Sequence, residues 1–365
     1  MKIICSKENL LEGINIVQKA VSTKTTLPIL EGILIEADDK VKMTGNDLEI
    51  GIECYVNADI QRKGSIVLNS RMFGDIVRRL PDSEVLMEVK ENNRVIIECE
   101  NSLFEIKGIP SEGFPQLPSI ERENGISISQ KLIKDMIKQT IFAVSVDENR
   151  PVLTGSLFEY KNGNLAIVSI DGYRLAMRTI KPDDDVQDRN LIIPGKTLNE
   201  IARIIQPIDD ELSIYTAGNQ ILFDMGKCIM VSRLIEGEYL NYMGIIPKEY
   251  ETKVTVNVKD LLACFERVSL VITNDERRYP VQLDISDEMI IITSNTEVGN
   301  AREEIRIEME GKKQAISFNP RYFIEALRVI DNETVSICFT SNVGPCIIKP
   351  LQGDDFTYLI LPIRK

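Results

Sequence analysis

The sequence contains no histidine and no tryptophan among its 365 residues. Histidine is the usual general base near neutral pH and the usual partner of a serine or cysteine nucleophile, so its absence excludes Ser-His and Cys-His mechanisms. The glycine-rich patterns GxxxxGK[ST] and GxGxxG are missing too, which removes the common nucleotide-binding loops. We therefore expect a protein that is not an enzyme and that has no cofactor and no bound metal.

Cysteine is scarce and scattered. The seven cysteines are odd in number and never form a CxxC pair, so their pattern predicts neither a disulfide framework nor a zinc site. We expect small, buried apolar side chains at all of them: Cys5, Cys54, Cys99, Cys228, Cys264, Cys338 and Cys346.

Long apolar runs are also lacking. The longest, such as Tyr358–Leu361, are far shorter than the roughly 20 residues that cross a bilayer. Because Met1–Cys5 leads directly into a charged stretch, we expect a cytoplasmic protein without a signal peptide and without a membrane partner. The 43% hydrophobic and 27% charged residues are ordinary for a globular protein of two or three domains.

The net charge of −13 would normally count against a nucleic-acid partner, but the basic residues recur at regular positions. The segments Leu68–Arg78, Ile193–Arg203 and Phe318–Arg328 resemble one another at a constant spacing of 125 residues (71 to 196, 196 to 321). Each has apolar residues at i, i+3, i+4 and i+7, which predicts a helix with one buried face. Two cations per helix fall on the opposite face: Arg71 and Arg78, Lys196 and Arg203, Arg321 and Arg328.

A second amphipathic, cation-bearing helix is predicted before each of these. The three lie at Ser6–Val21, Ser129–Val144 and Val258–Val271, with Ser6, Ser129 and Asn257 as candidate N-caps. Short basic loops then lead into segments that we interpret as strands beginning at Pro28, Pro151 and Pro280. Alternating segments indicate half-exposed antiparallel strands: Lys40–Thr44, Arg94–Glu98 and Glu304–Glu308.

These repeats predict an α+β protein of three domains with the same topology, at 1–124, 125–250 and 251–365. Polar stretches at Ser119–Gly125 and Lys248–Lys253 suit linkers. Antiparallel sheets packed end to end, with the helices on one side, would give a basic inner surface and an acidic outer one. Such a lining favours DNA binding despite the negative total charge.

Other interpretations remain open at this stage. Exposed i,i+4 ion pairs would give the same helix pattern, because an acid follows each first cation: Asp75, Glu200 and Glu325. The run Asp183–Asp185 could bind a hard cation but is more typical of a solvated loop. A metal-dependent enzyme acting on nucleic acid and a repeat-built scaffold without DNA are the alternatives. The terminal segment Tyr358–Lys365 could be a last strand or the rim of a peptide groove.

Several motifs in fixed order resemble those of the bacterial DNA sliding clamps, the beta subunits of DNA polymerase III, over essentially the whole chain. They are Thr26–Leu30, Thr44–Glu49, Gly113–Pro115, Asp171–Ala176, Phe318-Asn319 and Leu361–Arg364. The resemblance implies the clamp fold, in which two chains close head to tail into a ring with helices facing duplex DNA and sheets outside. It also implies a processivity factor that is opened by an ATP-driven clamp loader. Its partners would be the replicative polymerase and other replication or repair proteins that carry clamp-binding peptides.

The resemblance assigns roles to individual residues. Sliding requires contacts to phosphate, which carry no sequence information. Lys24 and Arg71 stand where the family has DNA-contacting cations, and Arg150 of the basic loop joins them and the other helix cations as a predicted DNA contact. The loop beside Arg150 departs from the family at Asp147, Pro151 and Val152, which leaves its contact with DNA open. Phe104, Val271 and Ile272 are the implied dimer interface.

The family also binds partner peptides in a pocket between its second and third domains. Leu240 stands where a proline is usual and Gly244 where an arginine is common, which would alter specificity at the rim. The implied wall consists of Leu153, Ile170, Gly172, Tyr173, Arg174, Leu175, Leu240, Ile245, Tyr322, Val343, Pro345, Leu359, Ile360, Leu361, Pro362, Ile363 and Arg364.

Overall fold

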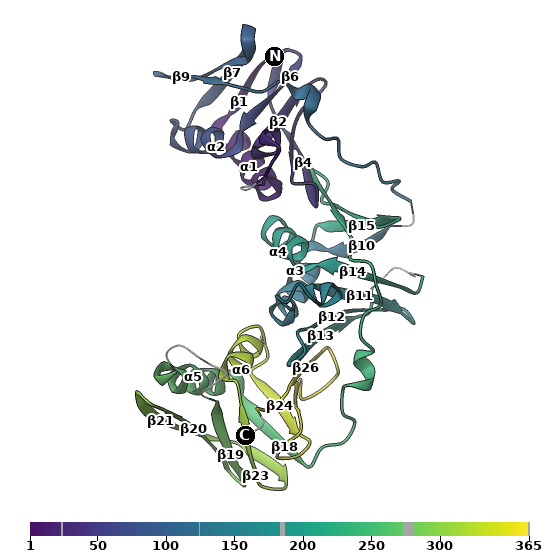
Figure 1. Ribbon diagram of the computed structural model, residues 1–365, viewed down its shortest axis with the longest axis vertical. Coiled ribbons are helices and arrows are strands. Elements are labelled where there is room, and N and C mark those ends of the chain that lie inside the picture. Colours follow the sequence, from purple (N-terminus) through teal and green to yellow (C-terminus); the bar gives the residue numbers. More distant parts are fainter. Residues whose placement is uncertain (23–24, 124, 183–186, 273–279, 364–365) are drawn as a thin grey trace. The chain divides into compact units, whose positions relative to one another are not determined.

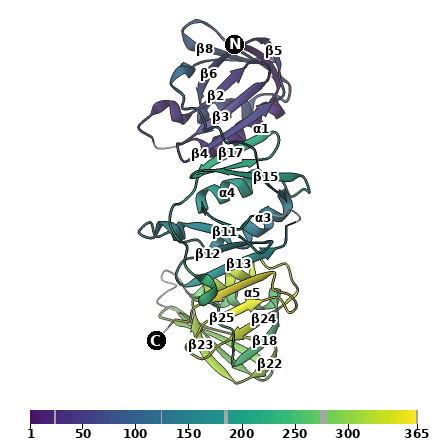
Figure 2. The same cartoon turned by 90° about the vertical axis from the view of Figure 1, so that its right-hand side faces the viewer.

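The computed structural model describes residues 1–22, 25–123, 125–182, 187–272 and 280–363. The chain divides into two compact units (Figures 1 and 2). The first comprises Met1–Lys131 with Arg203–Leu234, and the second Leu132–Ala202 with Ile235–Lys365. The division passes through the central repeat because its strands belong to two different sheets.

The first unit contains two antiparallel sheets. Their strand orders are β10-β15-β16-β17-β4-β3-β2-β6 and β5-β1-β7-β8-β9. The strands are β1 (Lys2–Ser6), β2 (Gly32–Ala37), β3 (Val41–Asn46), β4 (Ile50–Val56), β5 (Asp59–Arg62), β6 (Gly64–Asn69), β7 (Glu84–Val89), β8 (Arg94–Cys99), β9 (Ser102–Lys107), β10 (Ile126–Ser129), β15 (Glu211–Ala217), β16 (Gln220–Asp224) and β17 (Cys228–Arg233). Helices α1 (Lys7–Val17) and α2 (Ser70–Arg79) pack against each other.

The second unit has the same construction. Its antiparallel sheets have the orders β14-β11-β12-β13-β26-β25-β24-β18-β22 and β21-β20-β19-β23. The strands are β11 (Gly155–Lys161), β12 (Asn164–Ile170), β13 (Arg174–Ile180), β14 (Arg189–Pro194), β18 (Thr252–Asn257), β19 (Val281–Ser286), β20 (Met289–Thr296), β21 (Gly299–Arg306), β22 (Glu308–Gly311), β23 (Gln314–Phe318), β24 (Thr334–Phe339), β25 (Cys346–Lys349) and β26 (Phe356–Ile360). Helices α5 (Val258–Val268) and α6 (Pro320–Leu327) lie side by side. Helices α3 (Gln130–Lys138) and α4 (Gly195–Ile204) belong to the central repeat.

Side-chain caps explain where several helices begin. Ser6 accepts a hydrogen bond from the Asn9 amide at the start of α1, and Asn257 accepts one from the Asp260 amide at the start of α5. Asn69 and Asn319 cap α2 and α6 in the same way. Each cap satisfies an amide that the first helical turn leaves without a partner, which stabilises the helix by about 1 kcal/mol. Two of the predicted caps, Ser6 and Asn257, are thereby confirmed.

The structure corrects several predicted element boundaries. Pro28 and Pro151 begin 3₁₀ helices, η2 (Pro28–Glu31) and η6 (Pro151–Thr154), and the following strands start at Gly32 and Gly155. Proline suits the first position of a helix because its fixed φ is already helical. The helix predicted over Ser6–Val21 is α-helical only from Lys7 to Val17, and the 3₁₀ turn η1 (Gln18–Ala20) follows it. The predicted strand over Glu304–Glu308 is interrupted at Ile307, between β21 and β22.

The prediction for the cysteines was wrong for one pair. Cys54 on β4 and Cys228 on β17 are directly opposed across antiparallel strands and form a disulfide. They are 174 residues apart, and no local spacing reveals a strand pairing between two repeats. The other five cysteines are buried, as predicted.

Candidate functional sites

The repeated helices have the predicted phase. In α2, Phe73 and Val77 are fully buried while Arg71 and Arg78 are exposed. In α4, Leu198 and Ile201 are buried while Lys196 and Arg203 are exposed. In α6, Phe323 and Leu327 are buried while Arg321 is exposed, as is Arg328 at the C-cap of the helix. The phase is slightly looser than predicted, because Ile76 and Ala202 are only half-buried. Each helix therefore presents two cations to solvent.

The predicted i,i+4 ion pair between the first cation of a helix and the following acid is present in α6 but not in α2. Arg321 Nε lies 2.8 Å from Glu325 Oε1, as the i,i+4 pattern predicts. Asp75, in contrast, pairs with Arg78 at 3.0 Å and with Arg79 at 3.7 Å, so its partner is not Arg71. Exposed pairs of this kind stabilise by only about 0–1 kcal/mol, so they leave the arginines available to an anionic partner.

Two further predicted cations have different outcomes. The exposed Arg150 lies 3.5 Å from Asp147 in the loop after α3. Lys24 lies outside the described residues, as do Arg364 and the acidic run Asp183–Asp185.

Within the described part of the chain, no group of three or more acidic, cysteine or histidine side chains could hold a metal ion. No helix among the described residues is long and apolar enough to cross a membrane.

Most of the predicted peptide wall converges in the second unit. The apolar residues Leu153, Ile170, Leu175 and Leu359 form one small buried cluster, against which the half-buried Leu361 packs. Register explains the convergence: Ile170 pairs with Leu175 across β12 and β13, and Leu175 pairs with Leu359 across β13 and β26. Ile360, opposite Arg174, is also buried.

Four large apolar side chains of the predicted wall are open to solvent. Tyr173 is 50% exposed, Leu240 46%, Ile245 43% and Val343 61%. Exposed apolar side chains of this size are typical of a recognition surface. Leu240 and Ile245 flank the turn η7 (Tyr242–Gly244), which is anchored by the buried Tyr242 through a hydrogen bond from its hydroxyl to Glu159.

The motif Asp171–Ala176 contains the turn from β12 to β13 and the first residues of β13. Asp171 Oδ1 accepts hydrogen bonds from the amides of Tyr173 and Arg174, at 2.8 and 3.0 Å. Gly172 has a φ of +95°, which favours glycine. The Leu361 amide donates to the Tyr173 carbonyl at 2.9 Å, which ties the C-terminal segment to this turn. The predicted Pro345 lies in the turn before β25, where its carbonyl accepts a hydrogen bond from the Thr340 hydroxyl. Pro362 and Ile363 follow β26, and the Ile363 amide donates to the Ser317 carbonyl.

Arg174 is the most constrained charged residue in this region. Its side chain is only 8% exposed, and its guanidinium donates to Asp171, to Glu325 and to the Phe142 carbonyl. It also lies 4.6 Å from the ring of Tyr322, which stacks on Tyr173. A buried guanidinium requires such a complete set of partners. The family resemblance implied Arg174, Tyr173 and Tyr322 as wall residues, but Glu325 and Phe142 were missed as partners of Arg174.

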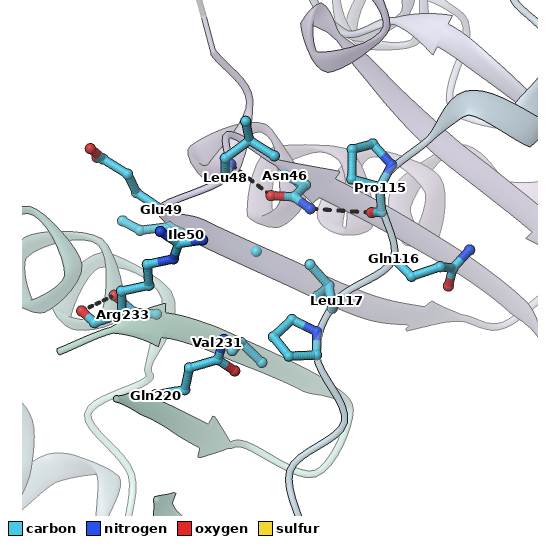
Figure 3. Close-up of a pocket in the computed structure, with 13 residues that line it drawn as sticks. Asn46, Leu48, Glu49, Ile50, Pro115, Gln116, Leu117, Gln220, Val231 and Arg233 are labelled. Atoms are coloured by element: carbon cyan, nitrogen blue, oxygen red, sulfur yellow. Dashed lines mark hydrogen bonds between the residues drawn. The ribbon is translucent and has the colours of Figure 1, made fainter. Parts of the chain in front are cut away.

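An unpredicted pocket of about 130 Å³ lies in the first unit, between β4, β17 and the segment Pro115–Pro118 (Figure 3). The Asn46 side chain accepts from the Leu48 amide and donates to the Pro115 carbonyl, which fixes this segment over the strands. Leu117 covers Gly51 so closely that a side chain there would collide with it. The side chain of Leu117 therefore occupies part of the space between the strands and this segment.

The two smaller sheets end in strands without a neighbour on one side, as far as the described residues show: β9 in the first unit and β21 in the second. On β9, Leu103 is 67% and Phe104 38% exposed. Beside β21 lies the turn η8 (Ser269–Val271), which includes the predicted Val271 and is followed by Ile272; both are half-buried. An unpaired strand edge is a ready template for pairing with another chain.

Comparison with known proteins matches all three parts of the chain to one family. Family models described as the N-terminal, central and C-terminal domains of the DNA polymerase III beta subunit match residues 1–118, 127–241 and 243–364. The beta sliding clamp of Halalkalibacterium halodurans is 36% identical over 100% of both chains.

Solved structures give the same result. The DNA polymerase sliding clamp of Bacillus subtilis superposes with a TM-score of 0.96 at 35% identity, covering 100% of this chain and 99% of the other. The beta subunit of the Streptococcus pyogenes DNA polymerase gives a TM-score of 0.94 at 31% identity, covering 100% of both chains.

Proposed function

Because the chain belongs to the DNA polymerase III beta subunit family, the sliding clamps, which are non-catalytic processivity factors, we propose that two copies of it close head to tail around duplex DNA. The proposal includes three repeat domains at 1–124, 125–250 and 251–365, helices that face the DNA, and a groove that binds peptides from replication proteins.

The observation that supports ring closure best is a repeated sheet junction. Both large sheets join the outer strands of two consecutive repeats: β17 pairs with β4, and β26 pairs with β13. By their position in the repeat, β9 corresponds to β17 and β26, and β21 corresponds to β4 and β13. Pairing β9 of one copy with β21 of another would repeat the same junction a third time.

This junction also accounts for the sizes of the smaller sheets. The orders β5-β1-β7-β8-β9 and β21-β20-β19-β23, placed end to end, reproduce the order β22-β18-β24-β25-β26-β13-β12-β11-β14 strand for strand. Two such contacts close a ring of two chains, because each copy has one β9 edge and one β21 edge. Phe104, Val271 and Ile272 would then lie at the contact.

Binding to DNA would use the exposed helix cations together with Lys24 and Arg150. Contacts to phosphate are independent of base sequence, as a sliding protein requires. The exposed ion pairs of Arg78, Arg321 and Arg328 do not prevent this, because such pairs are weak and a phosphate can replace a carboxylate as the partner of a guanidinium. Charge on the inner helices would draw DNA into the ring although the whole chain carries −13.

The second unit would bind short peptides of the polymerase, the clamp loader and repair proteins. Its exposed apolar residues Tyr173, Leu240, Ile245 and Val343 supply contact area, and the fixed Arg174 supplies polar specificity. A cytoplasmic location is part of the proposal, since the bacterial chromosome is replicated there.

The native mass of the protein tests ring closure most simply. We expect twice the mass of the 41.3 kDa chain in sedimentation equilibrium at micromolar concentration. A monomer or a trimer would contradict the proposal, because neither satisfies every β9 and β21 edge within a ring of six domains.

A further inference from the structure

Helix α6 presents residues to two different surfaces. Tyr322 faces Arg174 with its ring 4.6 Å from the guanidinium, and Arg321, the preceding residue, has a side chain that is 60% exposed. Glu325 lies one turn further along the helix with a side chain that is only 23% exposed. The helix therefore contributes Tyr322 to the proposed peptide groove and Arg321 to the surface that carries the cations.

Glu325 contacts both surfaces with one carboxylate. Its Oε1 accepts from Arg321 Nε at 2.8 Å, and its Oε2 accepts from Arg174 Nη1. Burial alone would raise the pKa of Glu325, but the hydrogen bonds from Arg321 and Arg174 outweigh burial and lower the pKa. The group is thus a carboxylate at neutral pH, shared between a buried and an exposed guanidinium.

The exposed side of this network borders a cavity whose lining contains two arginines and one carboxylate beside the apolar residues Ile272, Pro320 and Ile324. A pocket of about 260 Å³ is lined by Arg321 and Arg328, by Ser269, and by Glu325 itself. A phosphate that entered it would compete with Glu325 for the donors of Arg321, because charge-assisted bonds from arginine to phosphate and to carboxylate have similar geometry. Glu325 would then have Arg174 as its main cationic partner.

The buried side of the network holds the wall of the groove. Arg174 fixes the Phe142 carbonyl, Asp171 and the ring of Tyr322, and Tyr322 stacks on Tyr173 at 6.4 Å. A stronger Glu325–Arg174 bond would hold these groups more rigidly, so a peptide that binds there would lose less conformational freedom on binding.

We propose that Glu325 links the two binding surfaces, so that a DNA phosphate at Arg321 strengthens the binding of a partner peptide at Tyr173 and Tyr322. Glu325 is a positioning residue, because it touches Arg174 and Arg321 and acts through them. The inference rests on the proposed function, since it takes DNA as the anion and a replication peptide as the second ligand. Linkage is reciprocal, so the same factor must describe the effect of the peptide on DNA binding.

The test measures both sides of this linkage on the full-length protein. The probes are a short blunt-ended DNA duplex and a fluorescein-labelled peptide from the C-terminus of the replicative polymerase of the same genome. Peptide affinity is measured by fluorescence anisotropy with and without saturating duplex at constant ionic strength. We expect the duplex to tighten peptide binding about fivefold, and the peptide to tighten duplex binding by the same factor.

Two substitutions of the same chemistry on the same helix pair separate linkage from general charge effects. In Glu325→Gln the factor should fall to about one, because the amide cannot bridge two guanidiniums as an anion. Glu266→Gln is the matched control: Glu266 pairs with Arg328, the C-cap of α6, at 2.7 Å, whereas the guanidinium of Arg174 contacts Asp171, Glu325 and the Phe142 carbonyl. This control should keep the fivefold factor.

Each outcome decides between defined alternatives. A wild-type protein that binds the peptide equally with and without duplex would refute the linkage and leave the proposed function standing. A Glu325→Gln protein that keeps the factor would also refute it. If that variant does not fold, the exposed Arg321→Gln replaces it and must lose the factor at saturating duplex. Peptide that does not bind the wild type at all would refute the groove in the proposed function, and the linkage with it.

Discussion

The proposed ring predicts that Phe104 contributes to the contact between the two copies. Its side chain is apolar, lies on the edge strand β9 and is 38% exposed in the single chain. A phenylalanine side chain covers about 200 Å², so roughly 75 Å² of Phe104 is open to solvent and available to a partner. At about 25 cal/mol per Å² of apolar surface, removing this side chain would cost about 2 kcal/mol at one contact.

Head-to-tail closure doubles this cost, because both contacts of the ring contain a copy of Phe104. Phe104→Ala should therefore destabilise the dimer by about 4 kcal/mol, which raises its dissociation constant about a thousandfold at about 1.4 kcal/mol per factor of ten. Phe104→Glu should have a larger effect, because it would also bury an unpaired charge.

Sedimentation equilibrium or mass photometry across a concentration series measures the dissociation constant directly. Val146→Ala is a suitable control: Val146 is 97% exposed, more than Phe104, and lies in a loop instead of a strand edge. The control should leave the dimer unchanged. A Phe104→Ala protein with the dissociation constant of the wild type would refute the edge-to-edge contact.

Replacing Arg71, Lys196 and Arg321 together by glutamate should weaken retention on nicked circular DNA and reduce its salt dependence by roughly three phosphate contacts, with the dimer intact; an unaltered salt dependence would argue against the basic lining. Leu240→Asp combined with Val343→Asp should weaken binding of the polymerase peptide at least about tenfold in fluorescence anisotropy, whereas Ile208→Asp, at 43% exposure a similarly open position, should not. Glu325→Gln should lower the urea midpoint at pH 7. Because the pKa of Glu325 is lowered in the folded state, the stability that its carboxylate contributes is complete above the unfolded pKa of about 4.3 and is lost as the pH falls through the folded pKa. A difference in urea midpoint between wild type and variant that persists at strongly acid pH would mean that the carboxylate is not its source.

The sequence predicted well what depends on local periodicity. Apolar residues at i, i+3, i+4 and i+7 placed Phe73 and Val77 inside and Arg71 and Arg78 outside, because a helix has a fixed rotation per residue. Hydrogen-bonding side chains at Ser6 and Asn257 likewise marked helix starts. Prolines were less informative, since Pro28 fits the start of a 3₁₀ helix as well as that of a strand.

Features that depend on pairing between distant segments could not be predicted from residue patterns alone. Cys54 meets Cys228 only because β4 and β17 are neighbours in a sheet that spans two repeats. Arg174 meets Glu325 across 151 residues, and the only local sign of Glu325 was its i,i+4 spacing from Arg321. The motif that contains Arg174 was recognised through the family resemblance, which supplied the groove that periodicity does not reveal.

The central claim is topological: the protein encloses DNA and does not merely adhere to it. Clamp loaded onto nicked circular DNA by its loader and ATP is separated from free protein by gel filtration, and the DNA is then cut once by a restriction enzyme. The account predicts that the protein stays with the circle in moderate salt and leaves once the DNA is linear, because a ring can slide off a free end. Protein that remains bound equally after linearisation would contradict it.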